Sequence, residues 1–313
     1  MSGPAGPIRG ATVALTGYRH PTKDKGTSRV AFSTKVRTGI NSVLAVAGLR
    51  LDTLTAERRE HARLDMLDAA GLFDRPVYAL SPGMADFDVG PMAAAYNEHR
   101  EALERLRKLE TNDVGYNPDN TFFRSPDVDA LYLLVRTLKP ARVVEVGCGH
   151  STRITRQAIK DGGLSTQLIA IDPWPRAEIE AFVDRFERRR LEEVTDYSIF
   201  DELVPGDILF IDSSHLANLG NDVARLFCDV IPRLKPGVVI HVHDIFLPYE
   251  YPKHEARDWA GWGEQYVLHA LLQSGKHELL WPGQYLKRSG KWFEALPFLN
   301  NGPSHSFWFR YGG

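Results

Sequence analysis

The sequence predicts an α/β protein whose mostly parallel, doubly wound sheet occupies roughly the C-terminal two thirds of the chain. Two observations support this prediction. Four short apolar runs lack strict alternation, as strands buried on both faces do, and helical stretches lie between them. Alternating strands and helices imply parallel pairing with right-handed crossovers. The four runs are residues 141–146, 167–171, 207–211 and 237–243.

The N-terminal third predicts helices rather than strands. Residues 1–36 carry scattered Pro and Gly in a locally basic composition and predict a tail. An apolar patch at 38–51 and a charged segment at 56–67 predict a pair of helices, and residues 93–110 predict a strong helix with a thin apolar stripe. We therefore expect a helical extension over residues 1–111, serving as a lid or spacer, and a main domain over 112–313.

The main domain opens with a clear helix start. Ser125 is expected as the N-cap, Pro126 as the first helical residue and Asp127 in the first turn, and Pro140 ends the helix. Further helices are expected at 222–234, whose apolar residues share one side, and at 264–272.

Composition restricts the class of partner. The chain has 313 residues, 43% hydrophobic and 25% charged, a formal charge of -2 and a pI of about 6.6, so no basic field favours nucleic acid or an anionic membrane. No apolar run approaches the roughly 18 residues of a membrane span, and the N-terminus lacks the regions of a signal peptide. We expect a cytoplasmic protein with a small-molecule substrate and two reduced thiols, Cys148 and Cys228.

A glycine-containing loop follows the first predicted strand. Gly147 and Gly149 allow a sharp turn and close approach of a ligand to the backbone, and the helix that follows offers free N–H groups. Alone this pattern is weak evidence, because a tight turn without a ligand explains it as well. Glu145, however, ends a buried strand and needs a partner. Asp172 ends the second strand, where an acid can accept both ribose hydroxyls, and Trp174 can stack near an adenine.

These motifs together resemble class I S-adenosylmethionine (AdoMet)-dependent methyltransferases. The similarity covers about residues 112–313 and consists of Glu-x-Gly-x-Gly at 145–149, the acid at 172 and Asp-Ile-Leu-Phe-Ile-Asp at 207–212. It implies a Rossmann-like sheet of seven strands whose last strand, near 306–310, is antiparallel. The resemblance implies these AdoMet-binding residues: Glu145, Gly147, Cys148, Gly149, Ser151, Asp172, Pro173, Trp174 and Asp212.

The ends of the last two parallel strands resemble two methyltransferase groups. A bacterial family of small-molecule and sugar methyltransferases pairs a Gly-x-Ser-Thr loop with Ile-Asp-x-x-His and a His-Asp-Ile strand end, as here at 149–152, 211–215 and 243–245. Catechol-type O-methyltransferases hold a divalent metal with an Asp after strand four and an Asp-Asn pair after strand five. They place a Lys base three residues after the first Asp.

By this resemblance, Asp212, His243 and Asp244 are the candidate metal ligands and Asp212 and His215 the candidate catalytic residues. Histidine in place of the family's aspartate favours manganese, iron or zinc over magnesium. With an ordinary pKa near 6.5, His215 is suited to accept the proton of a substrate hydroxyl. Two simpler interpretations stay open: Asp212 as the cap of a turn, and His243 with Asp244 as a metal-free pair.

The first functional hypothesis is methyl transfer to a hydroxyl of a sugar or another polyhydroxylated small molecule. A nicotinamide-dependent oxidoreductase is the main alternative, because an acid also follows Gly149 by 23 residues (172 minus 149), although Thr152 occupies the third glycine position. AdoMet chemistry other than methyl transfer and a non-catalytic AdoMet-binding subunit remain further alternatives. A homo-oligomeric state is left open by the sequence.

Overall fold

The computed structural model describes residues 27–51, 54–176, 178–258 and 261–313, so most of the predicted tail lies outside the described residues. The chain divides into two compact units after Gly71. The first unit contains α1 (Thr27–Leu44), a 3₁₀ turn (Ala45–Ala47) and α2 (Thr55–Ala69), which is the predicted pair of helices with an earlier start. The boundary expected at residue 111 falls inside the second unit.

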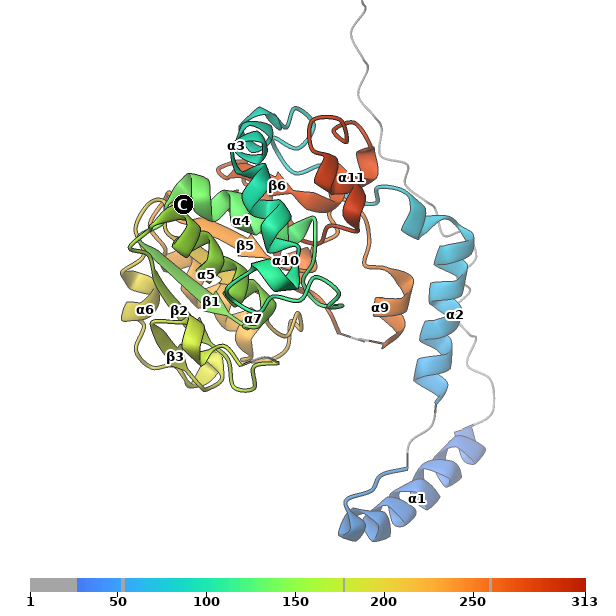
Figure 1. Cartoon of the computed structure of the whole chain (residues 1–313). Helices are drawn as coiled ribbons and strands as arrows, with labels where there is room; N and C mark the ends of the chain where they lie inside the picture. Colours follow the sequence, from blue (N-terminus) through green and yellow to red (C-terminus); the bar gives the residue numbers. More distant parts are fainter. Residues whose placement is uncertain (1–26, 52–53, 177, 259–260) are drawn as a thin grey trace, which may run out of the picture. The chain divides into compact units, whose positions relative to one another are not determined.

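The second unit, Leu72–Gly313, contains one sheet of seven strands. The strands are β1 (Arg142–Val146), β2 (Gln167–Ile171), β3 (Arg185–Glu187), β4 (Ile208–Ile211), β5 (Val239–Val242), β6 (Glu278–Pro282) and β7 (Phe307–Arg310). Their order is β3-β2-β1-β4-β5-β7-β6, and only β7 runs antiparallel to its neighbours β5 and β6. Figure 1 shows the sheet with helices around it. The predicted fold class is confirmed, including the antiparallel strand near 306–310.

Helices connect the strands in the alternating pattern that the sequence predicts. The α-helices of this unit are α3 (Gly90–Leu106), α4 (Asp127–Leu138), α5 (His150–Gly162), α6 (Ser198–Asp201), α7 (Asp222–Arg225), α8 (Ile231–Arg233), α9 (Lys253–Asp258), α10 (Glu264–Leu272) and α11 (Gly283–Ser289). A π-helical turn (Leu226–Val230) joins α7 to α8, so the helix predicted at 222–234 is one continuous helical stretch. Short 3₁₀ turns lie at Leu72–Asp74, Leu109–Thr111, Glu180–Phe182, Leu191–Glu193 and Pro297–Asn301.

The start of α4 differs from the expectation. Pro126 occupies the N-cap position and the helix begins at Asp127, with no side-chain hydrogen bond from the cap. The hydroxyl of Ser125 donates instead to the carboxylate of Asp129, which also pairs with Arg107. Ser125 is therefore not the N-cap, because Asp129, buried and charged, takes its hydrogen bond.

Two hydrophobic clusters cover the two faces of the sheet. Alternate residues of one strand belong to different clusters: Val143 packs in the first and Val144 in the second. Helix α3 contributes Leu103 and Leu106 to the first cluster, where α4 and α5 also pack, and both leucines are buried. Helix α3 is therefore part of the core of this unit.

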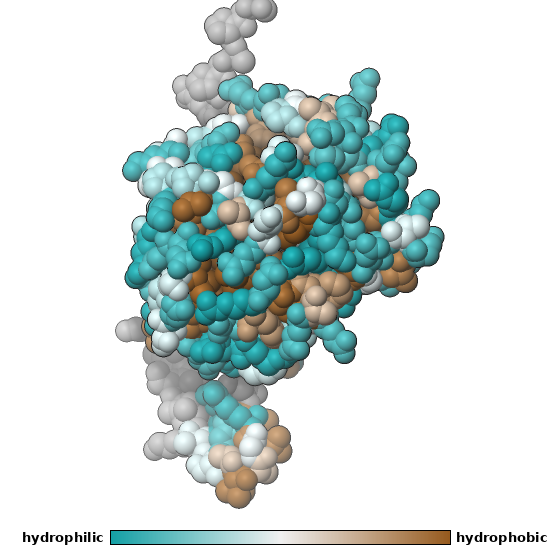
Figure 2. Space-filling model, turned by 60° about the vertical axis from the view of Figure 1, so that its left-hand side comes forward, coloured by the Kyte–Doolittle hydropathy of each residue, from teal (hydrophilic) through white to brown (hydrophobic). Residues whose placement is uncertain are grey.

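One face of the molecule can be followed in Figure 2. Figure 2 shows a face dominated by hydrophilic residues, between which apolar residues emerge in small groups. Within the described residues, no helix has the length and apolar character needed to cross a lipid bilayer.

Candidate active site

The glycine loop lies where β1 and β4, adjacent parallel strands, both end. Gly147 has φ +79°, and a Cβ there would lie 2.6 Å from the backbone carbonyl carbon of Asp212 and closer still to its oxygen. No residue with a Cβ fits this position without displacing the backbone. Gly149 differs, because its φ of 170° is ordinary extended backbone and a Cβ would meet no atom within 4 Å. The first glycine therefore serves the fold, whereas the second faces open space.

Glu145 is buried beneath this loop. The hydroxyl of Ser151 donates to its Oε1, while Oε2 has no hydrogen-bond partner among the described residues. Burial raises the pKa of Glu145 to about 8. Ser151, a predicted cofactor residue, thus holds Glu145 in place, and Glu145 keeps one oxygen able to accept a further donor.

Asp172, after β2, is bound to the loop by its carboxylate. Its Oδ2 accepts the backbone N–H of Cys148 at 3.0 Å and its Oδ1 accepts that of Trp174 at 2.7 Å. Trp174, which follows Pro173, is 70% exposed, and the guanidinium of Arg190 lies 5.1 Å from its ring centroid. The structure therefore brings the predicted residues of the loop and of the β2 end together at the carboxyl ends of the parallel strands.

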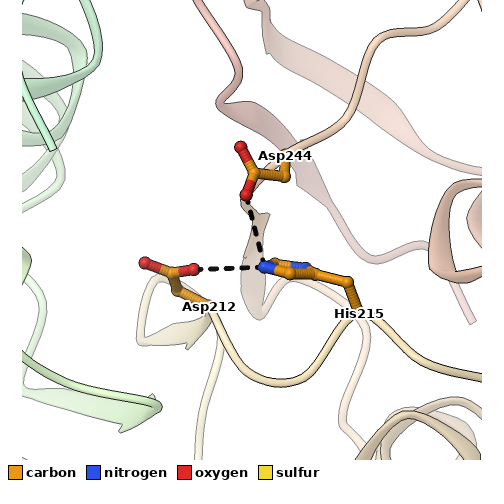
Figure 3. A group of neighbouring side chains, drawn as sticks. All are labelled: Asp212, His215 and Asp244. Carbon is orange, nitrogen blue, oxygen red and sulfur yellow. Dashed lines mark ion pairs between the residues drawn. The ribbon is translucent and has the colours of Figure 1, made fainter. Parts of the chain in front are cut away.

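A second cluster lies at the ends of β4 and β5. Figure 3 shows the ring of His215 directed at two carboxylates: its Nε2 lies 3.6 Å from Asp212 Oδ1 and 3.3 Å from Asp244 Oδ2. One ligand atom from each of these three residues lies within 4.8 Å of the others. Both His215 (φ +60°) and Asp244 (φ +53°) have left-handed backbone, which non-glycine residues adopt rarely and which is typical of functional sites.

His243, the third predicted metal ligand, contacts the same carboxylates from β5. Its Nδ1 lies 3.5 Å from Asp212 Oδ1 and 3.6 Å from Asp244 Oδ1. Its Nε2 lies 3.5 Å from Asp127 Oδ2, an ion-pair distance. All four predicted residues of the reaction end therefore converge, and both imidazoles are in contact with the Asp212 and Asp244 carboxylates.

Three further residues belong to this cluster and were not predicted as site residues. Glu264 Oε2 lies 2.9 Å from His215 Nδ1, and His305 Nδ1 lies 3.1 Å from Asp244 Oδ1. Asp127 accepts hydrogen bonds from the Ser304 hydroxyl (2.6 Å) and from the backbone N–H groups of residues 305 (2.8 Å) and 306 (3.2 Å). For Asp127 and Glu264 the only sequence signal was an acid in the first turn of a helix, which equally suits helix capping, and His305 carried no signal.

The charges of the cluster shift one another's pKa values. Burial alone lowers the pKa of His215, but its hydrogen bond to Glu264 and the negative charges around it raise the pKa to about 9. For His243, burial is likewise outweighed, chiefly by Asp212 and Asp244, and the pKa is well above its usual value. Burial raises the pKa of Asp244, but His243, His305 and His215 hold it below its usual range. Carboxylates and imidazoles thus stabilise one another's charged forms.

His241, in contrast, lies within β5 away from this cluster's carboxylates. It is fully buried, its Nε2 is 3.0 Å from the Ser306 hydroxyl, and its ring stacks on Phe210 at 3.7 Å. Burial lowers its pKa well below the usual value. It is a neutral, hydrogen-bonded histidine of the sheet.

A cleft of about 810 Å³ opens beside the loop that follows β2. Its lining includes Arg153 of α5, Arg176 after β2 and Arg188 after β3. Arg153 donates to the backbone carbonyls of Val114 and Glu178, so part of this positive charge holds neighbouring loops together.

Comparison with known proteins gives the class. Residues 144–245, from β1 to just beyond β5, match a family model described as a methyltransferase domain. A search of curated proteins found no match. The match agrees with the predicted class of enzyme, a methyltransferase. The strand order agrees with the predicted seven-stranded sheet.

Several solved structures are similar in outline at low identity. The O-methyltransferase TomG from Streptomyces achromogenes, solved with SAM, is 16% identical over 72% of this chain and 91% of its own, with a TM-score of 0.35. An O-methyltransferase from Bacillus cereus, solved with SAH, is 12% identical over 89% and 99%, with a TM-score of 0.36. The SAH-bound methyltransferase PaMTH1 from Podospora anserina is 16% identical over 70% and 88%, with a TM-score of 0.37.

Proposed function

We propose that this protein is an AdoMet-dependent O-methyltransferase that acts on a hydroxyl of a small polyhydroxylated molecule such as a sugar, with a divalent metal at the Asp212–Asp244 cluster. One observation carries the proposal. The glycine loop and the acid–histidine cluster share one edge of the sheet, with Gly147 packed against the backbone of Asp212. A methyl donor in the loop would therefore lie next to the groups that bind and deprotonate an acceptor.

The loop fits AdoMet on three counts. The unpartnered Oε2 of buried Glu145 suits the cationic amino group of the donor's methionine part. Asp172 uses one lone pair of each oxygen for a backbone N–H, and its remaining lone pairs can accept the ribose hydroxyls. The open space at Gly149 allows the ligand to approach the backbone. AdoMet supplies an electrophilic methyl group, and the residues named here bind and orient it.

The donor set suits a transition-metal ion. His243 Nδ1 lies 3.5 Å from Asp212 Oδ1 and 3.6 Å from Asp244 Oδ1, close to the roughly 3 Å between neighbouring ligands around an octahedral ion with bonds of about 2.1 Å. The compact group of ligand atoms, all within 4.8 Å of one another, comes from Asp212, Asp244 and His215, so His215 also faces this position. An imidazole among the ligands favours manganese, iron or zinc. The ion would lower the pKa of the acceptor hydroxyl and fix its oxygen. The ion would also offset the Asp212 and Asp244 charges that raise the pKa of His215, and His215, whose Nε2 faces these carboxylates, would then accept the proton.

Calorimetric titration of the purified, metal-analysed protein tests the proposal. We expect micromolar AdoMet affinity, no NADH binding, and weaker AdoMet binding in Asp172→Ala. We also expect a bound metal that chelation removes and that His243→Ala loses. Binding of NADH but not AdoMet would favour the oxidoreductase alternative. AdoMet binding with no metal retained or taken up would reduce the proposal to metal-free methyl transfer.

A further inference from the structure

The Nδ1 side of His215 contacts a carboxylate to which the proposed function gives no role. Glu264, the first residue of α10, is fully buried, and its Oε2 lies 2.9 Å from His215 Nδ1. The opposite ring nitrogen, Nε2, faces Asp212 and Asp244. The imidazole is therefore placed between one carboxylate on its Nδ1 side and two on its Nε2 side.

Backbone contacts join the two segments that carry these side chains. The carbonyl oxygen of His215 accepts the N–H of Gly263 at 3.0 Å, and Leu216 forms an isolated antiparallel bridge with Trp262. The ring of Trp262 also lies 4.8 Å from that of His215. The segment after β4 and the start of α10 are thus joined at the point where Glu264 meets His215.

The chemistry of the two groups determines which nitrogen carries the proton. An ionised carboxylate only accepts hydrogen bonds, so Nδ1 of His215 must donate to Glu264. The raised pKa of His215 favours the imidazolium, in which Nε2 also carries a proton. When that proton leaves, the lone pair is on Nε2, the nitrogen that faces Asp212 and Asp244. In addition, Oε1 of Glu264 has no hydrogen-bond partner among the described residues, so His215 is the group that compensates its burial.

We infer that Glu264 is the positioning residue of His215: it fixes the proton on Nδ1 and turns the Nε2 lone pair toward the gap between Asp212 and Asp244. This inference rests on the proposed function, in which Nε2 accepts the hydroxyl proton. Glu264 also stabilises the imidazolium that forms when Nε2 is protonated, because its negative charge lies at hydrogen-bond distance. The arrangement is that of a carboxylate–histidine pair, in which the carboxylate orients the base without accepting its proton.

Nuclear magnetic resonance of the full-length protein labelled with ¹⁵N-histidine tests the inference directly. We expect a slowly exchanging ring proton on Nδ1 of His215, assigned by its loss in His215→Asn and shifted downfield by the charged acceptor. In Glu264→Gln, a neutral residue of the same shape, this signal should move upfield or disappear. If the wild-type protein carries a proton only on Nε2 of His215, the inference is overturned, even where Glu264→Gln does not fold.

Glu250→Gln is the matched control. Glu250 accepts hydrogen bonds from Tyr266 of α10 and from Tyr78, and no contact joins it to His215 in the described structure. We expect Glu250→Gln to leave the His215 signal unchanged. An equal change of that signal in both variants would show a general loosening of α10 and would overturn the specific role of Glu264.

A second measurement separates positioning from support of the fold. We expect Glu264→Gln to keep AdoMet affinity within threefold of wild type, because Glu264 contacts His215 and not the glycine loop. A loss of more than tenfold in AdoMet affinity with an unchanged Nδ1 proton would overturn the inference in favour of a structural role. If the wild-type protein shows the Nδ1 proton but binds no AdoMet, the proposed function fails and the positioning of His215 stands.

Discussion

Replacing the two glycines of the loop separately should produce opposite kinds of defect. In Gly147→Ala the new Cβ lies 2.6 Å from the carbonyl carbon of Asp212 and 3.2 Å from the backbone nitrogen of Ser213. Both neighbours are backbone atoms at the end of β4, so no side chain can move aside to make room. In Gly149→Ala the Cβ meets no atom within 4 Å.

The magnitude follows from two costs at position 147. An L-residue in left-handed backbone costs about 1–2 kcal/mol. Forcing a methyl group into a packed site costs about 1–3 kcal/mol more. We therefore expect Gly147→Ala to lower the free energy of unfolding by about 2–5 kcal/mol. Gly149→Ala should change it by less than about 0.5 kcal/mol, as uncrowded substitutions do.

Urea unfolding followed by tryptophan fluorescence measures the difference, since Trp281 and Trp308 are fully buried and report loss of the core. The midpoint should fall in Gly147→Ala without a change of slope. Gly149→Ala should keep the unfolding midpoint of the wild-type protein, but its affinity for AdoMet, measured by titration, should be at least tenfold lower. If Gly147→Ala were as stable as wild type, the explanation of the first glycine by close packing against Asp212 would be refuted.

Three further outcomes are expected. The pKa of Glu145 is raised in the folded state, to about 8 from 4.5, so protonation stabilises the fold. As the pH rises from about 4.5 to 8, the free energy of unfolding of the wild-type protein should therefore fall, relative to that of Glu145→Gln, by up to about 1.4 kcal/mol per pH unit. Urea unfolding of both proteins at several pH values would measure this difference. Manganese at about 100 times its Kd should raise the free energy of unfolding by about 2.7 kcal/mol. In thermal melts, Asp244→Asn should show no such increase. An equal increase in the variant would exclude Asp244 as a ligand. Deleting residues 1–71 should leave the calorimetric unfolding midpoint of the second unit unchanged. Deleting residues 1–110 should lower this midpoint, because Leu103 is buried in the core of the second unit. Equal midpoints for the two deletions would contradict the observed boundary.

The buried parallel strands were predictable because their apolar runs are short and bounded by turn or charged residues. The prediction for β2 matches at both ends, and those for β1, β4 and β5 differ by at most two residues. Strands β3 and β6 were missed for physical reasons. β3 has three half-buried residues, two of them charged, while β6 ends in a proline and contains a register irregularity against β7. Neither carries the continuous apolar signal of a central strand.

The site was predictable only where a motif lies at a strand end. Asp212, His215, His243 and Asp244 follow β4 and β5 directly, so their convergence follows from the parallel order of the sheet. Glu264 lies 49 residues along the chain from its partner His215, and His305 lies 61 residues from its partner Asp244. Local sequence does not indicate such long-range pairs. The wrong N-cap at Ser125 has a local origin, since its hydroxyl bonds the buried carboxylate of Asp129 four residues later and the helix begins only at Asp127.

The position of β7 has a consequence for how the protein is made. Because β7 is inserted between β5 and β6, the edge of β5 stays unpaired until residue 310 has left the ribosome. Asp127, among the earliest residues of the site to be synthesised, acquires its hydrogen bonds from residues 304–306 only then. A nascent chain halted before residue 304 would display an open strand edge and a buried acid without its donors. Assembly of the reaction centre therefore requires residues 304–310, and a nascent chain halted before residue 304 should be an inactive, protease-sensitive intermediate.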